Sequence, residues 1–556
     1  MVWRPTGAIS PDLPQEIWLL VAQELANRRD FPALFTCARL SRSWANLALP
    51  LLYSIHEMSP ASNADDITDI ETSVGLWRSI IASSHAKTLY PYCHWIKALM
   101  LGNLYTLLED LARDSAAELR ALFFSPPLQH LRIRRGNNKG LNLDAIIVEV
   151  ANSVTACIRH AADQQDKVVG LTSLEGPHLP SANLPGWVSC LSRLTSLTVR
   201  DGSVLNARVA QAIRKNCPAF KEVVCLWCQG TDIDVTLAGF FQCLGPNTLE
   251  SFTVNSMNEI GEHTFQALSG HALSLKRLGL FSLKRSAFES LNRLGDCRAL
   301  ESLNLEASSD ALHLRWDGPL QHVFSEVVQW LGQCTRLEEL EFVRVPGATT
   351  ILGQVLKSPD VRLTNLNLKS DDFDEEFYRS LCHQQSLRQL MVRIVDDDVL
   401  EAGEVRRMLF VDALCHCREL RELDTNEMFT LDEFDRITTA APTLEEIVSN
   451  GELIDNSFFL PLLRLKQLKS LIVFGPSSFT VEGIHGFLKD LEADPEARHE
   501  GIQLYVAAQN WELKFSPQEE SGLMEEIRRR FGGKLDIAYR PDPDEMHESD
   551  FDNFSD

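Results

Sequence analysis

The side chains best suited to metal or redox chemistry in this sequence are thirteen cysteines and fifteen histidines. Cys225 and Cys228 form a C-x-x-C pair, but no second pair follows at the spacing of a zinc-binding module. The run Cys415-His416-Cys417 has no matching ligand pair at a useful distance. Phosphate-loop, serine-hydrolase and metalloprotease motifs are also missing from the sequence. Although a cysteine nucleophile could find its base far away in the sequence, we expect no enzyme activity, no cofactor and no metal site.

A phrase of the form L-x-x-L-x-L, with other apolar residues allowed at the leucine positions, recurs along the chain. Successive phrases begin 24 to 29 residues apart, except for two longer steps of 37 and 33 residues. A fixed period of this size indicates a solenoid, in which each unit buries its apolar edge against its neighbours. The phrases are Leu194-Leu197-Val199, Phe220-Val223-Cys225, Leu249-Phe252-Val254, Leu275-Leu278-Leu280, Leu300-Leu303-Leu305, Leu337-Leu340-Phe342, Leu363-Leu366-Leu368, Leu387-Leu390-Val392, Leu420-Leu423, Leu444-Ile447 and Leu468-Leu471-Val473.

Between the phrases, apolar residues such as Val209 and Ile213 return at helical spacing. A short strand, a connector and a helix in each unit resemble the leucine-rich repeats. This resemblance implies an α/β solenoid with parallel strands on its concave side and helices on its convex side. It covers residues 190–475 and extends more weakly to Ile96-Leu99-Leu101 and Leu128-Leu131-Ile133.

Four cysteines occupy the same place in the repeat. Cys217, Cys297, Cys334 and Cys417 each lie three residues before the first apolar residue of a phrase. We expect them to be small buried side chains where the helix joins the strand, without redox or metal chemistry. The same interpretation holds for the C-x-x-C pair, whose first cysteine occupies a strand position.

Charge and hydropathy narrow the classes of partner and the location. The net charge of −24 argues against nucleic acid as the main ligand, because phosphate binding needs a concentrated basic surface. The sequence contains no run of 18 or more apolar residues, so it predicts no membrane-spanning helix. The first residues do not resemble a secretory signal. We expect a chain with reduced thiols in the cytoplasm, the nucleus or both.

Insertions and the C-terminal end depart from the period. The longer steps hold an insertion at 307–320, which contains Trp316, and the run Asp396-Asp397-Asp398. Each forms either a loop beside a binding face or a surface loop without a role, and the sequence leaves both possibilities open. Residues 502–506 and 535–539 alternate like strands, and we expect them to cap the solenoid.

Residues 13–53 do not follow the repeat. Leu13-Pro14-Gln15-Glu16-Ile17 begins an apolar helix, and later apolar positions lead through Leu40 to Ser41-Arg42-Ser43-Trp44 and Leu51-Leu52-Tyr53. These patterns predict three short helices in about 40 residues, which bury too little apolar surface for an independent core. The module therefore needs a partner, either the solenoid or another protein.

The opening L-P-x-E-I, the late S-R-S-W and the Leu-Leu-Tyr exit resemble an F-box. An F-box followed by leucine-rich repeats resembles the F-box/leucine-rich-repeat proteins, especially those of fungal type. The resemblance implies a non-catalytic substrate-recognition subunit of a Skp-cullin-F-box ubiquitin ligase. In such a subunit the F-box docks on a Skp-type adaptor, which links it to a cullin, and the repeats hold a protein substrate. The implied adaptor contacts are Leu13, Pro14, Ile17, Leu40 and Trp44.

An alternative stays open, in which the chain is a leucine-rich-repeat scaffold or regulator whose N-terminal helices only cap the solenoid. Under either interpretation we expect four segments. They are an F-box-like helical module at 10–56, a linker or helical connection at 57–95, a solenoid with its C-terminal cap at 96–540 and a disordered acidic tail at 541–556.

Strand alternation also suggests where a substrate would bind. Arg277 and Phe281 point outward from one strand phrase, and an arginine beside an aromatic ring is a common interface anchor. Asn255 and Glu306 are expected to flank them on adjacent strands. The identity of the substrate, and any need for its phosphorylation, do not follow from the sequence. Further outward positions include Glu339, Glu341 and Met391.

Overall fold

A computed structural model describes residues 14–55, 67–135, 140–164, 169–177, 179–316, 318–394, 400–450, 454–493, 499–509 and 514–539. Leu13, the Asp396-Asp397-Asp398 run and the acidic tail predicted for 541–556 lie outside the described residues. The chain divides into two compact units, Met1–Ser256 and Met257–Asp556, called the first and second unit below. No helix in the described part of the chain is long and apolar enough to cross a membrane.

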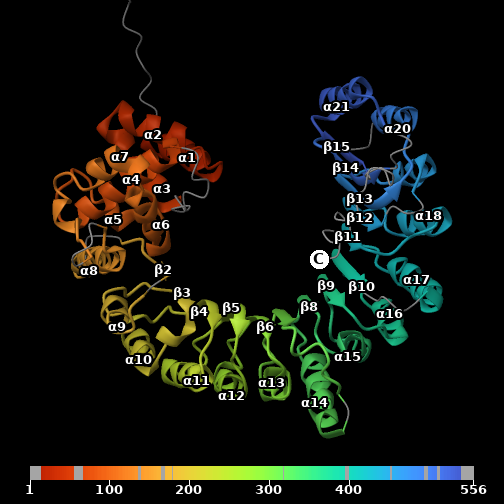
Figure 1. The fold of residues 1–556 in the computed structure, drawn as a ribbon, viewed down its shortest axis with the longest axis horizontal. Helices are drawn as coiled ribbons and strands as arrows, with labels where there is room; N and C mark the ends of the chain where they lie inside the picture. The colour runs from red at the N-terminus through yellow and green to blue at the C-terminus, as the bar shows by residue number, and fades with distance from the viewer. Residues whose placement is uncertain are drawn as a thin grey trace, which may run out of the picture. The chain divides into compact units, whose positions relative to one another are not determined.

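The first unit begins with the three short helices that the sequence predicts. They are α1 (Gln15–Asn27), α2 (Phe31–Leu40) and α3 (Arg42–Ile55). Asp30 caps α2, because its side chain accepts a hydrogen bond from the backbone N–H of Ala33 at 3.0 Å. A group of further helices follows (Figure 1): α4 (Ile67–Ser84), α5 (Tyr92–Trp95), α6 (Leu101–Ala112), α7 (Ala117–Phe123) and α8 (Leu143–Ala162).

Four parallel strands of the first unit pair in the order of the sequence. The region from α6 to α8 is inserted between the first two of them. The strands are β1 (Ala98–Met100), β2 (Ser173–Gly176), β3 (Ser196–Asp201) and β4 (Glu222–Cys228), and β5 (Ser251–Asn258) reaches across the unit boundary. The accompanying helices are α9 (Leu184–Val188), α10 (Ala207–Asn216) and α11 (Ile233–Leu244).

One of the two weak upstream phrases is a strand and the other is not. Leu99 lies in β1 as predicted, whereas the prediction of a repeat strand at Leu128-Leu131-Ile133 is wrong. Gln129–Leu131 is a 3-10 turn, and Leu128 and Leu131 are fully buried among the helices. A short apolar run fits a buried helical region as well as a strand, so spacing alone could not separate the two.

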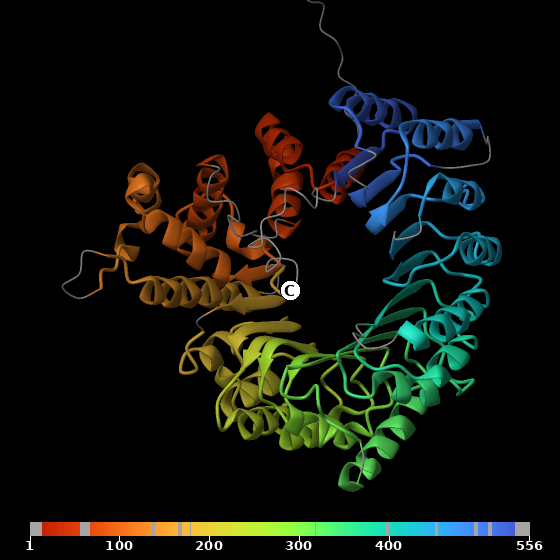
Figure 2. The same ribbon diagram turned by 45° about the vertical axis from the view of Figure 1, so that its right-hand side comes forward.

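The second unit is a leucine-rich-repeat array of parallel strands, each paired with the next one in sequence. In both views its strands line the inner side of an arc and its helices the outer side (Figures 1 and 2). The register keeps the middle leucines of successive phrases opposite one another, as in Leu278, Leu303 and Leu340. Leu278 is 1% exposed and Leu303 0% exposed, which confirms their predicted place in the apolar spine.

The strands of the second unit are β6 (Arg277–Leu283), β7 (Ser302–Ala307), β8 (Glu339–Val343), β9 (Asn365–Ser370), β10 (Gln389–Ile394), β11 (Glu422–Thr425), β12 (Glu446–Asn450), β13 (Ser470–Ser477), β14 (Gln503–Gln509) and β15 (Lys534–Tyr539). Its α-helices are α12 (Glu262–Leu268), α13 (Arg285–Phe288), α14 (Gln321–Gly332), α15 (Ala348–Val355), α16 (Glu375–Leu381), α17 (Leu400–Leu414), α18 (Leu431–Ala440), α19 (Phe459–Leu462), α20 (Val481–Ala493) and α21 (Pro517–Phe531). Thus β14 and β15, predicted as strands, continue the same parallel sheet.

The repeat cysteines are buried side chains that link neighbouring repeats. Cys217, Cys297, Cys334 and Cys417 are at most 2% exposed. Burial raises the pKa of Cys297 and Cys334 to about 12, so both remain thiols at neutral pH. The Cys334 thiol donates to the carbonyl of Cys297 at 3.6 Å, and the Cys297 thiol donates to that of Leu268 at 3.8 Å. These weak bonds satisfy carbonyl groups where an earlier helix ends.

Candidate functional site: a carboxylate pocket on the sheet face

The inner sheet face of the second unit presents every second side chain of its strands. Because side chains alternate along a strand, the middle leucines point to the opposite face, into the apolar core, and Leu340, Leu366 and Leu390 are each 2% exposed. The residues on either side of each middle leucine point away from this spine. Because the strands are parallel and in register, these outward residues align in rows that cross the sheet.

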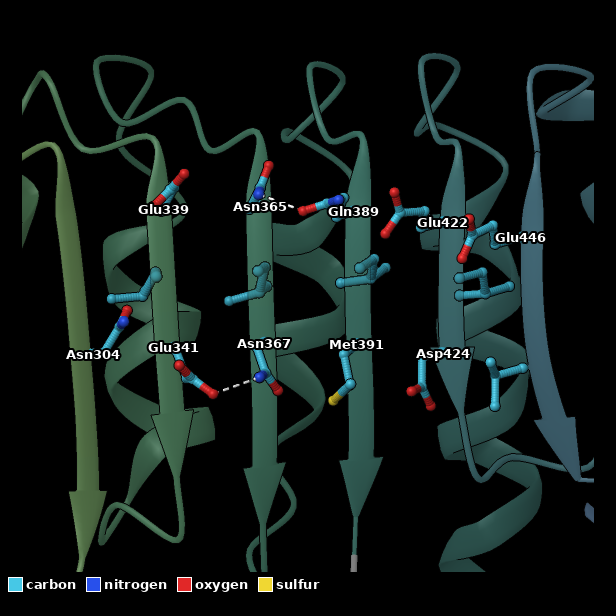
Figure 3. Close-up of a pocket in the computed structure, with 15 residues that line it drawn as sticks. Asn304, Glu339, Glu341, Asn365, Asn367, Gln389, Met391, Glu422, Asp424 and Glu446 are labelled. Atoms are coloured by element: carbon cyan, nitrogen blue, oxygen red, sulfur yellow. Dashed lines mark hydrogen bonds between the residues drawn. The ribbon is translucent and has the colours of Figure 1, made fainter. Parts of the chain in front are cut away.

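Two such rows line a shallow pocket of about 370 Å³, here called the carboxylate pocket (Figure 3). The strands β7 to β12 contribute to it. The first row, in the order of the strand register, is Glu339, Asn365, Gln389, Glu422 and Glu446. The second row is Asn304, Glu341, Asn367, Met391 and Asp424.

Amide side chains order part of the pocket. Asn367 Nδ2 donates to a carboxylate oxygen of Glu341 at 2.6 Å, and Asn365 donates to the side chain of Gln389 (Figure 3). Burial raises the pKa of Glu341, because its charged form is partly withdrawn from water. The Oδ1 atom of Asn367 is buried and has no hydrogen-bond partner among the described residues. A ligand that donates a hydrogen bond here would satisfy this acceptor.

Asp424 is the pocket carboxylate with a cationic partner. Its two oxygens accept bonds from Arg393 at 2.8 and 3.0 Å, the paired geometry that arginine and carboxylate prefer. The Arg393 guanidinium also lies 5.4 Å from the ring centre of Phe474, and this cation–π contact holds the arginine beside Asp424. Arg393 therefore neutralises one acid and leaves the others exposed to a ligand.

Three further carboxylates have no such partner. The side chains of Glu339, Glu422 and Glu446 make no hydrogen bond or ion pair with any residue that the structure describes. Glu422 and Glu446 are direct partners on adjacent strands. Like charges opposed in this way repel each other, so the free protein carries an electrostatic cost that a bound cation would remove.

The residues predicted as substrate anchors lie outside this pocket. Arg277 is exposed and Phe281 half-buried on β6, where the register shifts after Leu280. Glu306 is already engaged by Arg344, with 3.6 Å between the charged groups. Asn255 is exposed on β5 and belongs to the first unit. These four residues remain predictions and are not part of the pocket's lining.

Strand alternation in the sequence predicts the outward direction of Glu339, Glu341 and Met391. The predicted substrate anchors were an arginine and an aromatic ring, which are more common at interfaces. A signal was nevertheless present in the repeat phrase. The positions just before and after its middle apolar residue are carboxylates or amides in several consecutive repeats. The pocket residues that were missed are Asn304, Asn365, Asn367, Gln389, Glu422, Asp424 and Glu446.

Two of the predicted adaptor contacts, Ile17 and Leu40, are exposed apolar residues of the first unit. Ile17, Leu20 and Val21, separated by three and four positions, are 40%, 60% and 43% exposed on α1 and are called the apolar helix face below. Leu40, at the end of α2, is 66% exposed. Single exposed apolar residues are ordinary, but three on one face mark a surface suited to a protein partner.

The other predicted adaptor contacts differ in exposure. Pro14 is exposed at the start of α1. Trp44 is half-buried, and its ring meets that of Trp18 edge to face with 4.6 Å between centroids. It therefore holds α3 against α1 and remains partly exposed.

The end of α3 is anchored in the rest of the first unit. The ring of Tyr53 lies 4.8 Å from that of Tyr92, and its hydroxyl forms a 2.6 Å hydrogen bond with Ser79 Oγ. Burial raises the pKa of Tyr53 to about 12. The three N-terminal helices therefore join the following helices through α3, while the apolar helix face remains open.

The insertion at 307–320 is tied to the repeats by its tryptophan. Trp316 Nε1 donates to the carbonyl of Pro346 at 2.7 Å, and its ring packs against Phe324. Gly347 has a positive φ of 62°, and a Cβ there would lie 2.8 Å from the Trp316 ring. Trp316 thus packs against a turn that needs glycine, which favours a structural role for this residue.

Comparison with known proteins adds a fold-level likeness. No protein-family model and no curated protein sequence matches the chain. Among solved structures, an internalin from Listeria monocytogenes is 11% identical with a TM-score of 0.30, covering 69% of this chain and 94% of that one. The Rad7–Elc1 complex of yeast is 13% identical with a TM-score of 0.36, covering 68% of this chain and 93% of that one. A TLR13–ssRNA13 complex is 14% identical with a TM-score of 0.26, covering 68% of this chain and 63% of that one. These values carry no argument about function, so the fold assignment rests on the strand register.

Proposed function

We propose that this chain is a non-catalytic substrate-recognition subunit of a Skp-cullin-F-box ubiquitin ligase. The observation that carries the proposal is the presence of two open surfaces of opposite chemistry on different units. The apolar helix face suits a protein adaptor, and the carboxylate pocket suits a cationic protein segment. The F-box resemblance of the N-terminal phrases supports a Skp-type protein as the adaptor, with a cullin bound through it.

The carboxylate pocket supports a substrate with lysine or arginine side chains. Glu339, Glu422 and Glu446 supply three carboxylates without partners, and Glu341 supplies a fourth that an amide holds in place. Guanidinium and ammonium groups donate several hydrogen bonds each, and charge-assisted bonds are the stronger class. Met391 adds a flexible apolar contact for the aliphatic part of such a side chain.

The proposed mechanism is proximity. One end of the chain binds the ligase and the other holds the substrate, so that ubiquitin transfer from another subunit becomes effectively intramolecular. Under this proposal the chain needs no catalytic residue of its own.

Adaptor capture tests the ligase end. The double variant Ile17→Asp with Leu40→Asp is expected to lower co-purification of a Skp-type adaptor at least about tenfold, because two charges would enter an apolar interface. Val235→Asp is the matched control, since Val235 is 59% exposed on α11 of the same unit. Both proteins should give the circular dichroism spectrum and melting temperature of the unchanged chain.

The alternative, a scaffold whose N-terminal helices are only a cap, has one observation in its favour: the burial of Tyr53 against the following helices. Adaptor binding that is undetectable in the unchanged chain, or equal in the double variant and the control, would favour it. Deletion of residues 1–55 would be a poorer test of the adaptor, because it would also uncover the rings of Tyr92 and Trp95.

A further inference from the structure

Three potential metal ligands meet in the helical region of the first unit, on residues that belong to neither surface described above. Cys93 and His94 lie on α5, and Cys157 lies on α8. The two sulfur atoms are 3.5 Å apart, and Cys157 Sγ lies 3.6 Å from His94 Nε2. All three ligand atoms fall within 4.8 Å of one another. No second group of three such ligands is found among the residues that the structure describes.

These distances suit a tetrahedral zinc ion. With Zn–S bonds of roughly 2.3 Å and Zn–N bonds of roughly 2.0 Å, neighbouring ligand atoms in a tetrahedron lie roughly 3.5 to 3.8 Å apart. The two measured edges already have this length before any ion is bound. Two thiolates and one imidazole also form a donor set that favours zinc over magnesium or calcium.

The backbone holds the ligands in place. The N–H of Cys93 donates to Ser83 Oγ at 2.9 Å, and the N–H of Gly170 donates to the carbonyl of His94 at 2.9 Å. A Cβ at Gly170 would lie 3.2 Å from the carbonyl oxygens of Trp95 and Ile96, so glycine allows this close approach. Cys93 is 0% exposed and His94 is 8% exposed, which fixes both side chains by packing.

The third ligand is more accessible. Cys157 is half-buried and, together with His94 and His160, lines an open cavity of about 760 Å³. The repeat cysteines differ, because they are buried thiols bonded to backbone carbonyls.

We propose that Cys93, His94 and Cys157 bind one zinc ion, whose fourth position faces the cavity and takes water or His160. The site joins α5 to α8 and so ties the segment before β1 to the helix before β2. It rests on different residues from the proposed ligase function and stands or fails independently of it.

Metal analysis of the full chain tests the site. The protein is purified under reducing conditions, stripped with a chelator, reloaded with zinc and passed through a desalting column. Inductively coupled plasma mass spectrometry should give one zinc ion per chain. Loading with cobalt in place of zinc should give the intense visible absorption of tetrahedral thiolate coordination. Cys93→Ser, His94→Gln and Cys157→Ser should each weaken zinc binding by on the order of 100-fold or more, since even losing an outer-shell partner costs 10–100-fold.

Cys243→Ser is the control, because Cys243 is a half-buried cysteine on α11 outside the cluster; it should keep the full zinc content. Circular dichroism on each variant separates lost binding from lost folding, and Cys157→Ser, the most accessible change, is the least disruptive of the three. A folded, reduced chain that takes up no zinc would overturn the proposal. Zinc uptake that is unchanged in all three ligand variants would also overturn it, as would a Cys93–Cys157 disulfide in protein isolated without reductant.

Discussion

The apolar helix face and the carboxylate pocket are both open surfaces, yet they are built in opposite ways. The first consists of side chains on one helix whose neighbours Ala22 and Ala26 are buried, so that small residues face inward and large ones outward. The second consists of polar residues arranged in rows by the register of six strands. One surface suits an apolar partner at nearly any ionic strength, and the other attracts charge and weakens as salt increases. Under the proposed function, each surface holds its own partner.

The largest effect is expected in the repeat spine. Leu303→Ala should lower the free energy of unfolding by about 2–5 kcal/mol, because a fully buried leucine leaves a cavity. Since contacts in a solenoid are local, adjacent repeats should lose hydrogen-exchange protection before distant ones. Adaptor binding should persist, because the apolar helix face belongs to the first unit. A loss below about 1 kcal/mol in chemical denaturation would mean that the spine tolerates the cavity.

Charge removal in the pocket is expected to come next. Glu422→Gln with Glu446→Gln should weaken binding of a lysine- and arginine-rich peptide by about 10–100-fold at low salt, measured by fluorescence anisotropy. The folded protein itself should be no less stable, because the change removes a repulsion between opposed carboxylates. Glu482→Gln with Asp490→Asn, an equal charge change at exposed positions of α20, is the control. Equal peptide affinities in the two proteins would place the cationic site elsewhere.

A smaller effect concerns pH. Burial raises the pKa of Glu341, so this carboxyl takes up its proton at a higher pH than an exposed glutamate. As pH is lowered, peptide affinity should therefore begin to fall at a higher pH than it would with exposed carboxylates alone. Glu341→Gln should flatten this part of the curve of affinity against pH. The stability of the folded protein changes with pH in the opposite direction. The raised pKa of Glu341 stabilises the folded state below the ordinary pKa of a glutamate, and this contribution is lost as pH rises through the raised pKa. Titration of peptide binding between about pH 4 and 7.5 measures the first effect, and thermal melts over the same range measure the second.

The smallest effect is expected at the anchors that the sequence proposed. Arg277→Glu with Phe281→Ala should change peptide affinity by no more than about twofold, because both residues lie outside the carboxylate pocket. A larger loss, without loss of folding, would extend the binding face to β6 and restore the arginine–aromatic anchor. Adaptor binding serves as the internal control for both outcomes.

The repeat region could be predicted from the sequence alone. Each phrase carries its own strand and helix pattern, and each unit packs mainly on its neighbours, so the local period predicted the buried leucines and the place of Cys297 and Cys334. It also predicted the three N-terminal helices and the outward direction of Glu339 and Glu341. These features depend on residues a few positions apart, where spacing and periodicity are informative.

The pocket and the proposed zinc site depend on contacts between residues far apart in the sequence. The carboxylate pocket exists because the register brings Glu339 and Glu446, 107 positions apart, into one row. Cys93 and Cys157 are separated by 64 positions, and no period in the sequence relates one to the other. The packing of α5 against α8 brings those two thiols together, and no spacing rule covers such a contact. Pairings that cross long stretches of chain depend on how whole elements pack, and that packing is where the proposed zinc site arises.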